Sequence, residues 1–446
     1  MADLNSRMHA GMDEKLNPQI NSPMNSIERI VSKEKIPRVV KVRQFFDDSK
    51  IADPAQELRR KIRENLSYQT KITPGMRIAV AVGSRGVSHI PEFAREIVAA
   101  LKEKGAEPFV FPAMGSHGGA TAEGQRFMLE GLGVTEDYVG APIRATMETV
   151  ELGKTDKGLP VVMDKFAAEA DGIVIINRIK PHVAFRGPYE SGLMKMITIG
   201  CGKQQGAQYC HNLGFGHMAE NIPAIARVAI EKKNFIFAVG LVENAYHETC
   251  VIEVLNKEEI DSREPELQAY AKKRAARLWF DQLDVCVMDE IGKNISGTGF
   301  DTGVLGRYHT PYISGGPTIT KIGILDLTEQ SHGNANGVGI VDFTTKRLFD
   351  KFDPYQTYPN ALTSTVPLSV KMPMVLANDR QLFQAAIRTC NLLDKSQCRL
   401  VRFRNTIELG ELEVSENLIE EVNAHPFMEV ASDPYELPFD ENGNLF

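Results

Sequence analysis

Runs of apolar residues alternate with amphipathic segments along most of this chain. Continuous apolar runs that end in small residues are typical of buried parallel strands, and apolar residues at helical spacing predict the helices between them. The predicted strands of the N-terminal half are residues 76–84, 107–116, 172–179 and 235–242. The predicted helices of this half are residues 90–105, 120–133 and 221–233. This alternation predicts an α/β fold with mainly parallel sheets.

A second set of strands and helices follows a charged amphipathic segment at 263–280, which we expect to be a linking helix. Its predicted strands are residues 283–292, 320–327, 372–378 and 398–405, with a helix at 379–393. We therefore predict two α/β domains with an active-site cleft between them. The predicted divisions are a polar N-terminal extension at 1–35, an N-terminal domain at 36–265, a C-terminal domain at 275–405, and a tail at 406–446 that packs back on the first domain.

Composition narrows the class of protein. A chain of 446 residues exceeds the size at which one hydrophobic core stops growing, which agrees with two domains. The net charge of −7 argues against a nucleic-acid-binding surface, and the chain has neither a run of about 18 apolar residues nor a signal-peptide pattern. The six cysteines form no CxxC pair, so a zinc ribbon has no support, and the cysteine usage is typical of a reducing compartment. We expect a cytoplasmic protein that binds neither nucleic acid nor membrane.

Polar residues follow three predicted strands of the first half at the point where each strand ends. They are Ser84 and Arg85, then the turn Gly115-Ser116-His117, then the segment from Asn177 to His182. Ligands of open α/β sheets bind outside the carboxyl ends of the strands. The sequence therefore predicts that these three groups meet at one site.

Several of these residues fit more than one role. The glycine-rich turn at 115–121 suits an anion or phosphate site, but it also suits an ordinary tight turn. Arg85 can bind a carboxylate or phosphate, or form a surface ion pair. Lys195 has apolar neighbours, which can lower its pKa or simply cover its stem. Residues 180–211 contain too many glycines for one helix and predict a loop, a short helix and a further loop.

Four sequence elements make the region from about residue 75 to residue 215 resemble the nickel-dependent lactate racemase family. They occur in the family's order: Ser84-Arg85, Gly115-Ser116-His117, Pro181-His182, and Ser191-Gly192-Leu193-Met194-Lys195. A histidine also follows Lys195 by the family's interval, at His211. The resemblance implies an isomerase that racemises or epimerises a small-molecule 2-hydroxy acid.

The resemblance also implies a cofactor and residue roles. Lys195 would carry a nickel-pincer nucleotide as a thioamide, and His211 would be the protein ligand that completes a square-planar Ni(II). His117 and His182 would be the acid and base on opposite faces of the substrate while a hydride leaves C2 and returns to it. Arg85 would hold the substrate carboxylate or the cofactor phosphate. Further cofactor contacts are implied for Ser84, Gly115, Ser116, Ser191 and Gly192.

Departures from the family pattern concern the substrate. Extra residues stand at 185–190, Val82 replaces an expected acidic residue, and the expected Tyr-Gln pair of the second domain is absent from 289–301. Lys293 is our candidate for the missing cation that contacts cofactor and substrate, and Arg186 is an added candidate for substrate binding. These changes suit a 2-hydroxy acid larger than lactate, such as a sugar acid. The resemblance also implies cofactor-building enzymes as partners.

Two other functions remain open on the sequence. Lys195 can form a Schiff base with a carbonyl substrate without any metal, although such an enzyme would not need His211. A non-catalytic protein that binds an anionic metabolite between two α/β domains would need Arg85 and the glycine turn, but not His117 and His182 together. The sequence indicates neither the particular acid nor the oligomeric state.

Overall fold

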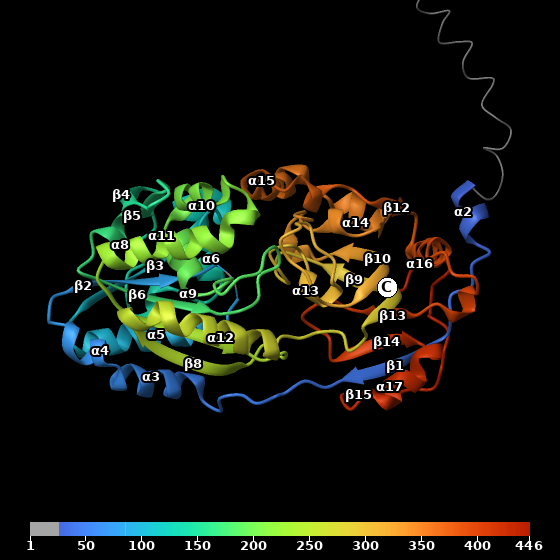
Figure 1. Ribbon diagram of the computed structural model, residues 1–446, viewed down its shortest axis with the longest axis horizontal. Helices are drawn as coiled ribbons and strands as arrows, with labels where there is room; N and C mark the ends of the chain where they lie inside the picture. Colours follow the sequence, from blue (N-terminus) through green and yellow to red (C-terminus); the bar gives the residue numbers. More distant parts are fainter. Residues whose placement is uncertain (1–25, 85) are drawn as a thin grey trace, which may run out of the picture.

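Two β-sheets, one in each half of the molecule, organise the fold (Figure 1). The computed structural model describes residues 26–84 and 86–446, so Arg85 and most of the predicted N-terminal extension lie outside the described residues. Strand-helix alternation in both halves confirms the predicted α/β class with mainly parallel sheets. No helix among the described residues is long and apolar enough to cross a membrane.

The first sheet has the strand order β3-β2-β6-β7-β8. Its strands are β2 (Arg77–Val82), β3 (Glu107–Pro112), β6 (Gly172–Arg178), β7 (Phe235–Glu243) and β8 (Thr249–Asn256). The first four strands in space are parallel, and β8 pairs antiparallel with β7. A small hairpin of β4 (Thr149–Lys154) and β5 (Pro160–Asp164) lies beside it.

Helices cover both faces of the first sheet because alternate residues of its strands are buried on opposite sides. Ile78, Val80 and Val82 of β2 pack against α3 (Pro54–Glu64), α4 (Leu66–Lys71) and α5 (Ile90–Glu103). Ala79 and Ala81 face α9 (Leu193–Lys195), α11 (Met218–Lys232) and α12 (Ile260–Arg274). Shorter helices complete this half: α6 (Ala122–Gly131), α7 (Glu136–Val139), α8 (Lys165–Ala168) and α10 (Lys203–His211).

The second sheet has the order β12-β11-β10-β9-β13-β14-β1-β15. Its strands are β1 (Val39–Gln44), β9 (Gln282–Ile291), β10 (Thr318–Leu327), β11 (Phe343–Thr345), β12 (Met374–Leu376), β13 (Leu400–Phe403), β14 (Glu411–Ser415) and β15 (Met428–Val430). The helices of this half are α2 (Ser26–Val31), α13 (Thr302–Leu305), α14 (Lys346–Lys351), α15 (Pro354–Ser364), α16 (Asp379–Thr389) and α17 (Ile419–Ala424). Its first five strands in space are parallel, and the last three pair antiparallel.

A strand from the N-terminal part of the described chain pairs with strands of the tail in the second sheet, which corrects our expectation for the tail. β1, which we assigned to the first domain, pairs with β14 and β15 of the tail (Figure 1). Val40 and Val42 of β1 are buried in the same core as Leu412 and Val414 of the tail. Residues 406–446 therefore pack on the second half rather than on the first. β1 and the tail strands thus add to the second half outside the predicted limits of 275–405, while the division between the two domains at 265–275 stays a prediction.

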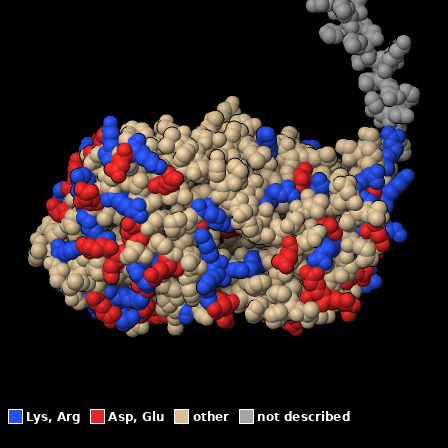
Figure 2. All heavy atoms as spheres, in the orientation of Figure 1, with Lys and Arg blue, Asp and Glu red and all other residues tan. Residues whose placement is uncertain are grey.

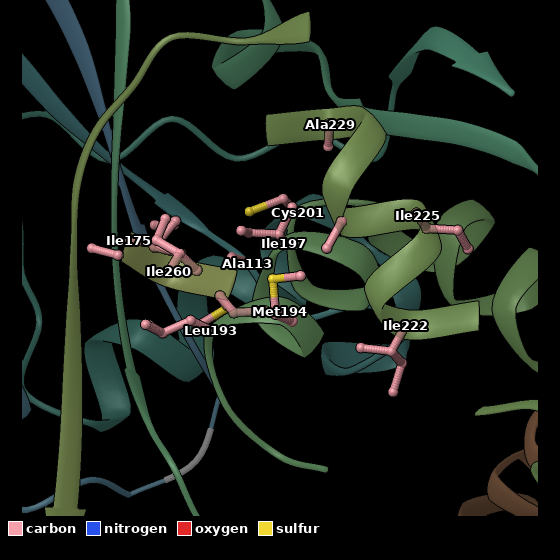
Figure 3. Close-up of a cluster of buried hydrophobic side chains, with 14 of the residues drawn as sticks. Ala113, Ile175, Leu193, Met194, Ile197, Cys201, Ile222, Ile225, Ala229 and Ile260 are labelled. Atoms are coloured by element: carbon pink, nitrogen blue, oxygen red, sulfur yellow. The ribbon is translucent and has the colours of Figure 1, made fainter. Parts of the chain in front are cut away.

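Residues 193–211, which contain Lys195, are more helical than the short helix and loop that we predicted. α9 is followed by a π-helical turn at Met196–Gly200 and then by α10. Leu193, Met194 and Ile197 of this segment lie in the core with Ile175 of β6 and Ile222 of α11 (Figure 3). Because these apolar side chains are buried, the backbone that carries Lys195 is held firmly against the sheet.

Candidate active site

A cavity of about 270 Å³ is lined by residues from both halves of the chain. Figure 2 shows Lys and Arg side chains gathered beside a hollow in the middle of one face. The predicted site residues that line the cavity are Ser84, Ser116, His117, His182, Ser191, Lys195, His211 and Lys293. Of the predicted set, Gly115, Gly192 and Arg186 do not line it, and Arg85 lies outside the described residues.

The cavity suits anionic ligands. Among the described residues that line it, Arg178, Lys180, Lys195 and Lys293 are cationic and none is Asp or Glu. Arg178 forms an ion pair with Glu243 behind the wall. An excess of positive charge in a partly enclosed cleft favours carboxylate and phosphate groups.

His117 lies in the turn that follows β3, opposite the end of β2. The hydroxyl of Ser84 is hydrogen-bonded to Nδ1 of His117. Nε2 of Gln125 donates to the carbonyls of Gly115 at 2.9 Å and of His117 at 3.2 Å. Gly115 has φ of +60°, and a Cβ there would lie 3.2 Å from the side chain of Ile199. Gly115 therefore shapes the turn that presents His117, whereas Ser116 lines the cavity itself.

A buried ion pair between Lys203 and Asp164 packs behind the turn that carries His117. We did not predict this pair from the sequence. Nζ of Lys203 donates to the carbonyl of Pro112 at 2.7 Å and to Oε1 of Gln125, and it lies 3.5 Å from Oδ2 of Asp164. Both charged side chains are fully buried. Burial raises the pKa of Asp164 to about 6 and lowers the pKa of Lys203. Lys203 stands among glycines, a pattern that does not distinguish a buried lysine from an exposed one.

The loop that carries His182 is fixed by a buried carboxylate. Glu190 accepts the backbone N–H of His182 at 2.8 Å and that of Gly187 at 3.1 Å. Nδ1 of His182 accepts the N–H of Ala184 at 3.1 Å, so the neutral imidazole carries its proton on Nε2. The ring packs on Phe185, with 4.4 Å between ring centroids.

Arg186 supports this loop and does not line the cavity. Its Nη1 donates to the carbonyl of His182 at 2.7 Å and lies 3.3 Å from Glu190, which also pairs with Lys272 at 2.6 Å. Because the guanidinium is engaged with its own loop, its geometry indicates a role in positioning His182 rather than the substrate contact that we predicted.

Lys195 lines the cavity at the end of α9. At the other end of this short helix, the buried carboxyl group of Glu264 accepts the N–H of Met194 at 2.7 Å. A Cβ at Gly192 would collide with this carboxyl group, and the carbonyl of Gly192 accepts from Asn177 at 2.8 Å. Burial raises the pKa of Glu264 to about 8. Glycine is thus required at 192 for close packing behind Lys195.

His211 is the last residue of α10 and also reaches the cavity. Its Nδ1–H donates to the carbonyl of Ala207 at 2.7 Å, which leaves Nε2 as the nitrogen with the lone pair. The ring remains partly accessible at the wall, but the surrounding protein lowers its pKa, and the nearby charge of Lys195 acts in the same direction. A neutral imidazole oriented by a backbone carbonyl is the form in which histidine binds metal ions.

The C-terminal half supplies the opposite wall. Nζ of Lys293 donates to the carbonyl of Gly297 at 2.8 Å and to Oδ1 of Asn360 at 3.2 Å. His309 and Asn336 also line the cavity, and our sequence reasoning missed both. They lie in loops without hydrophobic periodicity, so only the folded arrangement brings them to the site.

A comparison with family models agrees with the resemblance found in the motifs. Residues 27–222 match the family model described as Lactate racemase N-terminal domain. A similar solved structure is the lactate racemase apoprotein from Thermoanaerobacterium thermosaccharolyticum, with 12% identity, a TM-score of 0.44, and coverage of 86% of this chain and 93% of that chain. No curated protein matches the chain. The family match confirms the resemblance to the lactate racemase family over residues 27–222.

Proposed function

We propose that this protein is a racemase or epimerase of a 2-hydroxy acid larger than lactate. The match to the lactate racemase N-terminal domain supports this proposal. The observation that supports it best is that His117, His182, Lys195 and His211 line one cavity with no acidic side chain among its described residues. These four residues come from separate segments, so their convergence is a property of the fold.

The donor groups present fit a nickel-pincer nucleotide. Among the described residues, no group of three or more His, Cys, Asp or Glu side chains could hold a metal ion by itself. His211, with its Nδ1–H bound to Ala207, offers one neutral nitrogen donor, and Lys195 lines the same cavity. In this proposal Lys195 holds the nucleotide covalently and His211 is the single protein ligand to Ni(II). When bound, this group supplies a reversible acceptor for the hydride of C2.

The two other histidines provide acid and base chemistry. Inverting C2 through a keto acid requires that the proton of the substrate hydroxyl be taken and returned for either enantiomer, which calls for two positioned groups. His182 carries its proton on Nε2 when neutral, because Nδ1 accepts from Ala184. His117 is oriented through Nδ1 by Ser84 and would exchange protons through Nε2. Each histidine thus works from a fixed ring orientation.

Cationic side chains around the cavity would bind the anionic groups of substrate and cofactor. Arg178 and Lys180 lie at and beyond the end of β6, and Lys293 lies on the opposite wall. They would bind the substrate carboxylate and the nucleotide phosphate, with Arg85 as a further candidate. Cofactor-building enzymes are the proposed partners and the cytoplasm the proposed location.

The first test is intact-protein mass together with nickel content, on full-length protein co-produced with cofactor-building enzymes. We expect a mass increment on the peptide that contains Lys195 and about one nickel per chain. Lys195→Ala should lose the increment. His117→Ala and His182→Ala should keep both increment and nickel but lose more than 99% of racemisation, since each removes an essential proton-transfer group. Absence of the increment in cells shown to make the cofactor would contradict the proposal and leave the Schiff-base and binding-protein alternatives.

A further inference from the structure

Two buried polar side chains on the C-terminal wall of the cavity have hydrogen-bonding atoms without a partner. His309 and Asn336 are each 7% exposed, and both line the cavity. Nδ1 of His309 and Oδ1 of Asn336 make no hydrogen bond. Buried polar atoms are nearly always paired, so unpaired atoms in two side chains that line one cavity point to a ligand that supplies the missing partners.

His309 stands across Phe215 from His182. The ring of Phe215 lies 6.1 Å from His309, edge to face at 82°, and 6.0 Å from His182. Next to His309, the hydroxyl of Thr310 donates to the carbonyl of Ala184, which fixes the loop beside the proposed reaction centre. Burial lowers the pKa of His309 to about 4, so its imidazole is neutral at physiological pH. His309 can therefore recognise a neutral polar group in the cavity that His182 also lines.

The orientation of Asn336 decides which kind of group fits. Its Nδ2 donates to the carbonyl of Gly297 at 2.9 Å, and Lys293 donates to the same carbonyl. The amide is thereby fixed with Oδ1 as an unused acceptor. A carboxylate has no proton to donate to this oxygen, whereas a hydroxyl does, and a hydroxyl can also pair with the imidazole of His309.

The other residues of this C-terminal wall are also mostly neutral polar side chains. Apart from Lys293, whose ammonium is engaged by Gly297 and Asn360, its polar lining residues are neutral. They are Thr298, Asn360, Thr363, Ser364 and Ser369. Neutral hydroxyl and amide groups in a partly enclosed wall suit several hydroxyl groups of a ligand more than a second negative charge.

We propose that His309 and Asn336 determine substrate specificity by binding hydroxyl groups beyond C2, so that the substrate is a polyhydroxy acid. This inference rests on the proposed function for the location of C2. Lactate would leave both side chains unpaired, and a dicarboxylate would bring an anion against Oδ1 of Asn336.

The test is calorimetric binding of D-gluconate, L-lactate and L-malate to the full-length protein loaded with cofactor. We expect gluconate to bind at least tenfold more tightly than either other acid. His309→Phe and Asn336→Leu should each weaken gluconate binding about tenfold and change lactate binding less than twofold. His309→Phe removes an unpaired buried polar atom, so its midpoint of thermal unfolding without ligand should equal or exceed that of the parent. Asn336→Leu removes an unpaired oxygen but also the hydrogen bond from Nδ2 to Gly297, so its midpoint should stay close to that of the parent.

Each other outcome has a definite meaning. Equal affinities for the three acids, tighter binding of malate, or unchanged gluconate binding in both variants would overturn the inference. If gluconate binds and both variants weaken it, but the loaded protein inverts none of the acids, the proposed function fails, whereas binding of a polyhydroxy acid by His309 and Asn336 stands. The two failures are therefore distinguishable.

Discussion

The carboxyl group of Glu264 shows how one residue can fix the conformation of another that carries the chemistry. It occupies the space that a side chain at Gly192 would need, and it accepts the N–H of Met194 next to Lys195. Its side chain is fully buried, and burial raises its pKa to about 8. At neutral pH the group is therefore mainly a neutral acid, which is compatible with its apolar surroundings.

Replacement of Glu264 by Gln should change how stability depends on pH. The folded pKa of Glu264 is raised above its unfolded value, so its contribution to stability is fully present below about pH 4.5 and is lost as pH rises through about 8. Glutamine resembles the protonated acid and does not titrate. The free energy of unfolding of the parent relative to Glu264→Gln should fall by about 1 kcal/mol per pH unit between these limits. Denaturant unfolding at pH 5 to 9 measures this difference, and a constant difference would show that Glu264 is ionised throughout.

Single residues also show what sequence can reveal about a site. Ser84, His117, His182, Lys195 and His211 were predicted because each stands in a short motif or at a strand end, and all five line the cavity. Arg186 contacts its own loop and does not line the cavity, which the sequence could not show, because a loop arginine has the same local pattern in either case. His309 and Asn336 were missed because their position depends on how the second half folds over the first.

At the scale of elements, the buried pair Lys203–Asp164 connects three segments around the His117 turn. Lys203 opens α10, Asp164 ends β5, and Gln125 of α6 joins both to the turn. Loss of one partner of a buried ion pair leaves an uncompensated charge, which typically costs about 3–5 kcal/mol. The network thus couples the helix that ends at His211 to the turn that carries His117.

Lys203→Met should therefore reduce the free energy of unfolding by about 3–5 kcal/mol. The double variant Lys203→Met, Asp164→Asn should recover part of this loss, because asparagine can still cap α8 through Oδ1 without a buried charge. Chemical denaturation of the parent, both single variants and the double variant gives the coupling energy. Purely additive effects would mean that the two side chains do not interact.

Some strands of this fold can be predicted from the local hydrophobic pattern, and others cannot. The buried strands β2, β3, β6 and β7 were found from continuous apolar runs, since both of their faces are covered by helices. β1 and the tail strands are short, and their partners lie more than 350 residues apart in the chain. No local pattern encodes such a pairing, so the tail was assigned to the wrong half.

On the scale of the whole molecule, the two halves are joined directly beside His182. The hydroxyl of Thr302 donates to the carbonyl of Val183 at 2.7 Å, and that of Thr310 donates to the carbonyl of Ala184. The N–H of Arg186 donates to the carbonyl of Tyr312 at 3.1 Å. Residues 183, 184 and 186 therefore each form a hydrogen bond with the second half, which links the packing of the two halves to the position of His182.

The double variant Thr302→Val, Thr310→Val should loosen this junction without altering side-chain shape. Each lost hydrogen bond costs about 1 kcal/mol, so the amide proton of Arg186 should exchange with solvent at least tenfold faster by hydrogen-exchange mass spectrometry. Amides of β2 should be unaffected. Thr344→Val is a matched control, because it removes a similar bond to the carbonyl of Ile324 within the second half. Equal exchange of Arg186 in all three proteins would show that the halves are held together elsewhere. Faster exchange together with reduced turnover of the loaded enzyme would mean that the second half sets the position of His182 during the reaction.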